Sequence, residues 1–211
     1  MTDISLMCYS EARPMVTTPF AATQSGSLTF FTGPMACGKT LELVRHLHIF
    51  REQQIPLVCI RPAIDTRTPT VQSRSGLLHD AVAIVTSDLL ALTEAMVGKV
   101  VIAIDEFQFF PAEIVSVLEQ ELRKGKTILL SGLDTDFRGI LFPSSQAVLA
   151  LPETIIQRSR AVCSVCHQYN ATRTQRLKNG QPVGKDDPVV VVEHANDIIT
   201  YEARCLEHHQ I

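Results

Sequence analysis

Residues 33–40 are Gly33-Pro34-Met35-Ala36-Cys37-Gly38-Lys39-Thr40, and they fit the phosphate-loop pattern G-x-x-x-x-G-K-[ST]. The preceding residues 27–32 are typical of a short buried strand, and the following residues 41–47 are typical of a helix. Glycines let consecutive backbone N–H groups point at phosphate oxygens, and a helix N-terminus adds positive potential there. The stretch therefore predicts a strand–loop–helix unit that binds a nucleoside triphosphate.

Two side chains of this loop have predicted tasks. Lys39 would neutralise charge on the β- and γ-phosphates, and the Thr40 hydroxyl would ligate Mg²⁺. The alternative is a glycine-rich turn that contains Lys-Thr by chance. The strand and helix patterns on either side favour the phosphate loop over that alternative.

The composition limits the classes of partner. A chain of 211 residues can hold one ordinary core and a small appendage. Its net charge of −3 argues against a nucleic-acid binder, whose footprint is normally basic. No apolar run approaches the ~20 residues of a membrane span, and the start Met-Thr-Asp lacks a signal core. We therefore expect a cytoplasmic protein with neither a membrane nor a nucleic-acid partner.

Short apolar runs alternate with helical patterns up to about residue 157. We expect strands at 27–32, 57–60, 81–85, 100–105 and 127–131, and helices at 40–53, from the cap residues 86–88 to about 97, and at 112–124. Continuously apolar strands that alternate with helices predict a parallel sheet with helices on both faces. Ligands bind at the carboxyl ends of such strands, so the loops after residues 32, 60, 104 and 131 are expected to meet at one site.

Three parts of the chain are predicted. Residues 1–26 lack periodicity and are expected to be a flexible extension. Residues 27–157 are the expected ATP-binding α/β domain. Residues 158–211, where the alternation stops, are expected to form a small zinc-binding module with a further strand at 189–192.

Two acids follow one of the predicted strands. Asp105 ends the strand, which is the usual position of a magnesium partner in this fold class. Glu106 could accept a proton from a hydroxyl that attacks the γ-phosphorus, or it could polarise a water as in an ATPase. The Asp-Glu pair alone does not choose between the two.

An aromatic segment follows these acids, with the sequence Phe107-Gln108-Phe109-Phe110. Its rings could supply a stacking face and its amide could contact a nucleobase edge. The alternative for Phe107 and Phe110 is that they are buried rings of the core.

The C-terminal part carries two pairs of candidate metal ligands, Cys163 with Cys166 and Cys205 with His208. Together they make the Cys₃His set of a tetrahedral structural zinc site, with His209 as the alternative fourth ligand. A redox role for Cys-x-x-Cys would need a thioredoxin-like context, which is absent. Zinc would therefore hold residues 167–204 as an ordered loop.

Taken together, these segments resemble the zinc-containing, P-loop (type II) thymidine kinases from about Leu28 to His208. The matching segments, in the family's order, are residues 33–40, 61–67, 104–110, 132–139, 163–166, 172–176 and 201–205. The resemblance implies that the γ-phosphoryl of ATP is transferred to the 5′-hydroxyl of thymidine or deoxyuridine with Mg²⁺. It implies Glu106 as the general base and Arg67 as a phosphate-side contact.

The resemblance also implies which residues bind the nucleoside. Met35 and Phe109 would lie near the base and Tyr201 against the nucleoside, and the zinc-held loop, which contains Thr174, would contact the pyrimidine edge through backbone groups. Members are typically homotetramers and are often inhibited by the triphosphate end product. Two rival functions stay open: an ATPase with a zinc module that acts on nucleic acid, and a non-catalytic nucleotide-binding regulator.

Overall fold

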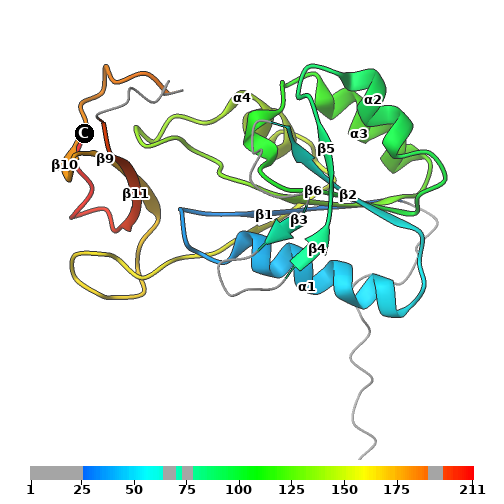
Figure 1. The fold of residues 1–211 in the computed structure, drawn as a ribbon, viewed down its shortest axis with the longest axis horizontal. Helices are drawn as coiled ribbons and strands as arrows, with labels where there is room; N and C mark the ends of the chain where they lie inside the picture. The colour runs from blue at the N-terminus through cyan, green and yellow to red at the C-terminus, as the bar shows by residue number, and fades with distance from the viewer. Residues whose placement is uncertain (1–25, 64–69, 73–77, 190–196) are drawn as a thin grey trace, which may run out of the picture.

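A six-stranded parallel sheet is the largest element of the fold (Figure 1). The computed structural model describes residues 26–63, 70–72, 78–189 and 197–211. The strands are β1 Ser27–Thr32, β2 Leu57–Pro62, β5 Val82–Ile84, β6 Val101–Ile104, β7 Thr127–Ser131 and β8 Thr154–Arg158. They lie in the order β5-β2-β6-β7-β1-β8, and every neighbouring pair is parallel. The predicted fold class is confirmed.

Helices cover both faces of this sheet. They are α1 Lys39–Glu52, α2 Leu89–Ala95, α3 Ile114–Arg123 and α4 Pro143–Leu149. Successive strand residues point to opposite faces. Phe30 and Ile102 therefore pack in one core with α2, α3 and α4, whereas Phe31 and Ala103 pack in another with α1 (Figure 1). Among the described residues, no helix has both the length and the apolar character needed to cross a membrane.

The sequence patterns did not predict three elements of the parallel sheet and the helices around it. The 3₁₀ helix η1, Phe107–Phe109, precedes α3, which begins at Ile114 rather than at residue 112. The short helix α4 begins with a proline, and β8 is an edge strand with only two large apolar residues. Elements this short have weak periodicity, and their contacts with the rest of the sheet hold them in place.

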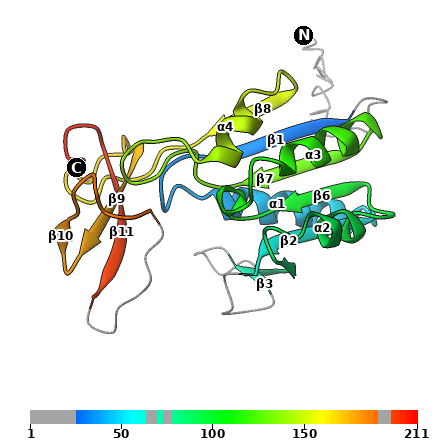
Figure 2. The same ribbon diagram turned by 90° about the horizontal axis from the view of Figure 1, so that it is seen from above.

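A second, antiparallel sheet lies beside the first, next to the end of β1 (Figures 1 and 2). Its strands are β9 Arg173–Lys178, β10 Gln181–Pro182 and β11 Ile199–Arg204, in the order β10-β9-β11. In a separate two-stranded sheet, β3 Thr70–Gln72 pairs antiparallel with β4 Leu78–Asp80. Nearly all of the predicted N-terminal extension, and residues 190–192 of the strand predicted at 189–192, lie outside the described residues.

A buried residue of the central strand tests the core. Ile102 in β6 is fully buried, whereas Leu90 in α2 is 71% exposed. We expect Ile102→Ala to lower the free energy of unfolding by about 2–5 kcal/mol, because the vacated volume leaves a cavity. The control Leu90→Ala should cost below about 1 kcal/mol, because it changes a surface side chain. Urea unfolding followed by circular dichroism measures both, and equal losses would contradict this packing.

Candidate active site

The glycine-rich loop at residues 33–40 wraps around the N-terminus of α1. Gly33 and Gly38 have φ angles of 133° and 92°, which favour glycine, and Ala36 has a φ of 61°. A Cβ atom on Gly33 would lie 2.3 Å from the Ser159 carbonyl oxygen, so glycine is also required there sterically. The helix dipole supplies positive potential at this N-terminus. The strand–loop–helix unit predicted from the sequence is therefore present.

The side chains of Lys39 and Thr40 point to different parts of the site. The Lys39 ammonium donates to the carbonyl oxygens of Gly33 at 3.2 Å and Pro34 at 2.8 Å, within the loop. The Thr40 hydroxyl lies 3.3 Å from the Asp105 carboxylate, at the end of β6. Ser131, the last residue of β7, donates its hydroxyl to the same carboxylate. The ends of β1, β6 and β7 thus converge on one site, as predicted.

Asp105 is a buried carboxyl group in an unusual electrostatic setting. Burial raises its pKa to about 7, and the neighbouring charge of Glu106 contributes to the rise. Hydrogen bonds from Ser131 and Thr40 act in the opposite direction without cancelling it. A carboxylate and a hydroxyl at this position are oxygen donors of the kind that Mg²⁺ prefers, so the residues fit a magnesium ion.

Glu106 sits in a left-handed backbone conformation, with φ of 50°, directly before η1. Its carboxylate accepts a hydrogen bond of 2.6 Å from the Gln108 amide. The Gln108 carbonyl oxygen accepts in turn from the Leu133 backbone N–H at 3.0 Å. A Cβ atom on Gly132 would lie 2.6 Å from that oxygen, so the loop after β7 leaves just enough room for Gln108. Gln108 therefore fixes where the Glu106 carboxylate points.

Both polar atoms of the Gln108 side chain thus have partners within the protein, so its predicted contact with a nucleobase stays a prediction. In the same segment, Phe107 and Phe110 are buried core rings. Phe109 is 45% exposed. It is the exposed ring of this segment, so its predicted contact with the base stays a prediction.

The small sheet touches the glycine-rich loop directly. The Met35 backbone N–H donates to the hydroxyl of Thr174, in β9, at 3.0 Å. Tyr201 lies on the neighbouring strand β11, opposite Arg176 of β9. Of the three predicted nucleoside contacts, Met35 in the glycine-rich loop therefore contacts Thr174 in β9, and Tyr201 lies on the strand that pairs with β9. Arg67, the predicted phosphate contact, lies outside the described residues.

The four predicted metal ligands Cys163, Cys166, Cys205 and His208 come together, with their ligand atoms within 4.8 Å of one another. This spacing and donor set fit a tetrahedral zinc site. Burial would raise the pKa of the Cys163 thiol, but backbone hydrogen bonds from Cys166, Cys205 and Val165 outweigh it and lower the pKa to about 6. The thiolate is the form that binds a metal.

His209, the alternative fourth ligand, is engaged elsewhere. Its Nε2 atom lies 2.8 Å from the carbonyl oxygen of Phe137, in the loop after β7. The described residues therefore select His208 and not His209 as the fourth member of the cluster.

Fold and site together define a class, the α/β proteins with a parallel sheet and a glycine-rich loop at a helix N-terminus, here with a small Cys₃His module attached. A model of the thymidine kinase family matches residues 26–209. The chain is 40% identical over 191 residues to a thymidine kinase of Coprothermobacter proteolyticus, covering 90% of this chain and 93% of that protein. It is 37% identical over 197 residues to one of Thermococcus kodakarensis, covering 88% and 95%. The chain therefore belongs to the thymidine kinase family.

Metal analysis tests the Cys₃His cluster. We expect about one zinc per purified chain, because four ligand atoms already lie at suitable spacing. Cys205→Ser should lose most of this zinc, whereas the matched control Cys37→Ser, in the glycine-rich loop, should keep it. Full zinc content in the Cys205→Ser protein would contradict the assignment.

Proposed function

We propose that this protein is a thymidine kinase that transfers the γ-phosphoryl group of ATP to the 5′-hydroxyl of thymidine or deoxyuridine. One observation carries the proposal: the Glu106 carboxylate is held by Gln108 beside the Asp105–Thr40 pair at the end of the glycine-rich loop. Membership of the thymidine kinase family supports the choice of nucleoside as acceptor.

The donor half of the site is residues 33–40 with Asp105. Backbone N–H groups of the loop and the Lys39 ammonium would bind the phosphates of ATP. Thr40 and Asp105 would hold Mg²⁺, which when bound neutralises charge on the β- and γ-phosphate oxygens. Arg67 is the further phosphate contact in this proposal.

The acceptor half contains the general base. Glu106 would accept the proton of the 5′-hydroxyl while that oxygen forms its bond to the γ-phosphorus. The bond from this phosphorus to the bridging oxygen breaks, and ADP leaves with the bond electrons. Gln108 holds one carboxylate oxygen of Glu106, and in this proposal the other accepts the substrate proton.

The nucleoside would bind between the aromatic segment and the small sheet, in contact with Met35, Phe109, Thr174, Tyr201 and, at the base edge, Gln108. Cys163, Cys166, Cys205 and His208 would hold a zinc ion that ties the two ends of this module together. Four protein ligands leave no position for a substrate, so the zinc would be structural.

We further propose a homotetramer in the cytoplasm. The edge strand β8 exposes Ile155 and Ile156 at 53% and 47%, an apolar edge that a neighbouring subunit could cover. None of the described cysteines forms a disulfide, which is typical of a reducing compartment. Light scattering of the purified protein measures the assembly, and a monomer at micromolar concentration would contradict it.

Incubation of the protein with ATP, Mg²⁺ and thymidine separates the proposed function from its rivals. Thymidine monophosphate and ADP in equal amounts, detected by chromatography, are the expected products. ADP formation that needs nucleic acid and no thymidine would indicate an ATPase. Binding of ATP without turnover in either assay would indicate a regulator.

Replacing the proposed base tests the mechanism. We expect Glu106→Gln to lower kcat by about 10²–10⁴-fold, because general-base catalysis is lost while nucleotide binding persists. The matched control Glu113→Gln changes an exposed glutamate just before α3 and should leave kcat unchanged. Steady-state kinetics and ATP titration measure both, and wild-type turnover in the Glu106→Gln protein would remove Glu106 from this role.

A further inference from the structure

Arg176 is the largest side chain that the described part of the protein buries completely. It lies in the middle of β9, and only 2% of its side chain is exposed. A buried guanidinium stays charged, so its burial is costly unless it is paired and its donors are used. Neither the proposed phosphoryl transfer nor the metal cluster uses this residue.

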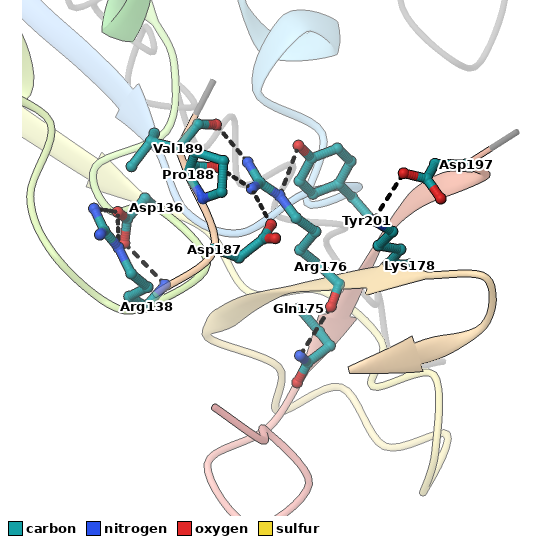
Figure 3. Close-up of polar contacts among 10 residues, drawn as sticks. All are labelled: Asp136, Arg138, Gln175, Arg176, Lys178, Asp187, Pro188, Val189, Asp197 and Tyr201. Atoms are coloured by element: carbon teal, nitrogen blue, oxygen red, sulfur yellow. Dashed lines mark hydrogen bonds and ion pairs between the residues drawn. The ribbon is translucent and has the colours of Figure 1, made fainter. Parts of the chain in front are cut away.

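Three nitrogens of Arg176 bind to two separate segments of the small module (Figure 3). Nη1 donates to the Asp187 carboxylate at 2.8 Å and to the Pro188 carbonyl oxygen, and Nη2 donates to the Val189 carbonyl oxygen. Nε donates to the Tyr201 hydroxyl at 3.0 Å. The planar fork of one arginine thereby joins residues 187–189 to β11.

The same guanidinium also packs against the α/β part of the protein. Its carbon lies 4.3 Å from the ring centroid of Phe137, a buried residue in the loop after β7. The nearby Asp136 does not pair with Arg176, because Arg138 and two backbone N–H groups use its carboxylate. Arg176 therefore anchors the small sheet to this loop through its stacked face.

Strand geometry links Arg176 to the proposed nucleoside site. Residues i and i+2 of a strand share a face, so Thr174 and Arg176 point to the same side of β9. Thr174 accepts from the Met35 N–H, and Arg176 stacks on Phe137, so this face is the one toward the α/β domain. Gln175, on the opposite face, instead bonds to the backbone of Gln210.

Tyr201 combines a fixed hydroxyl with an accessible ring. Its hydroxyl is held by Arg176, yet 40% of the residue is exposed. A ring fixed in this way loses little conformational freedom when a flat ligand binds against it, and such preorganisation favours affinity.

We propose that Arg176 is a positioning residue for nucleoside binding: it fixes Tyr201 and residues 187–189 against Phe137, so that the surface that contacts the nucleoside is formed before the nucleoside arrives. This inference rests on the proposed nucleoside kinase function. Arg176 acts on the substrate through these partners and does not touch the reacting atoms.

The test separates nucleoside binding from chemistry. Arg176→Lys keeps the positive charge but loses the planar guanidinium group and its several N–H donors. We expect the KM for thymidine to rise about 10- to 100-fold, as for lost charged hydrogen bonds, with kcat, the KM for ATP and zinc content near wild type. Tyr201→Phe keeps the ring and should raise the KM for thymidine about 3- to 10-fold.

Two further measurements complete the design. The double variant should resemble Arg176→Lys alone, because both changes break the same contact. Hydrogen exchange in peptides spanning residues 181–189 should be faster in Arg176→Lys than in the wild type. Lys178→Gln is the matched control. Lys178 lies two residues along the same strand, its side chain is 45% exposed, and the change removes its ion pair with Asp197, so the kinetics should match the wild type.

A KM for thymidine within about twofold of wild type in both single variants overturns the role of Arg176 and leaves the proposed function intact. If Arg176→Lys does not fold, the KM of Tyr201→Phe decides. A wild-type protein that phosphorylates neither thymidine nor deoxyuridine overturns the proposed function, and the role of Arg176 in nucleoside binding falls with it.

Discussion

The arrangement of the site depends on the hydrogen bonds of the buried residue Asp105. Hydroxyl groups of Thr40, at the start of α1, and Ser131, at the end of β7, contact its carboxylate. The Asp105 backbone N–H donates to the Ile60 carbonyl oxygen of β2. Burying a carboxylate without such partners would be costly, so these contacts hold the strand ends together. Its pKa nevertheless rises to about 7, so the protein alone leaves the negative charge undercompensated. A bound cation would supply the missing compensation.

A second constraint follows immediately along the chain. The backbone turns sharply after β6, with Glu106 in a conformation that costs a non-glycine residue free energy. That turn places Gln108 against the loop after β7. Gly132 leaves room there for the Gln108 carbonyl oxygen, and the Leu133 N–H donates to it. The position of the proposed base is thus set by a loop distant in sequence, and the strain is retained because these contacts determine the conformation.

Local patterns were enough to predict the central strands, α1 and the glycine-rich loop, because apolar strands and a glycine-dependent turn leave direct marks in the sequence. The Cys₃His set could also be predicted, since ligand spacing is a local property. The edge strand β8 and the small sheet have no comparable pattern, because tertiary contacts stabilise them. The contacts of Gln108 with Leu133 and of Arg176 with Tyr201 each join residues 25 positions apart, so neighbouring residues gave no indication of them.

The small module is therefore fastened by two kinds of chemistry with different consequences. The Cys₃His cluster joins the two ends of the module, and a bound metal would reduce the entropy cost of ordering the intervening loop. It does not by itself fix the position of Tyr201 relative to Phe137. Arg176 adds that geometry, because its fork and its stacked face accept only one arrangement of their partners. A buried hydrophobic residue could provide similar stability without this directional constraint. Geometry at the proposed nucleoside site is therefore the reason that we propose for burying a charge here.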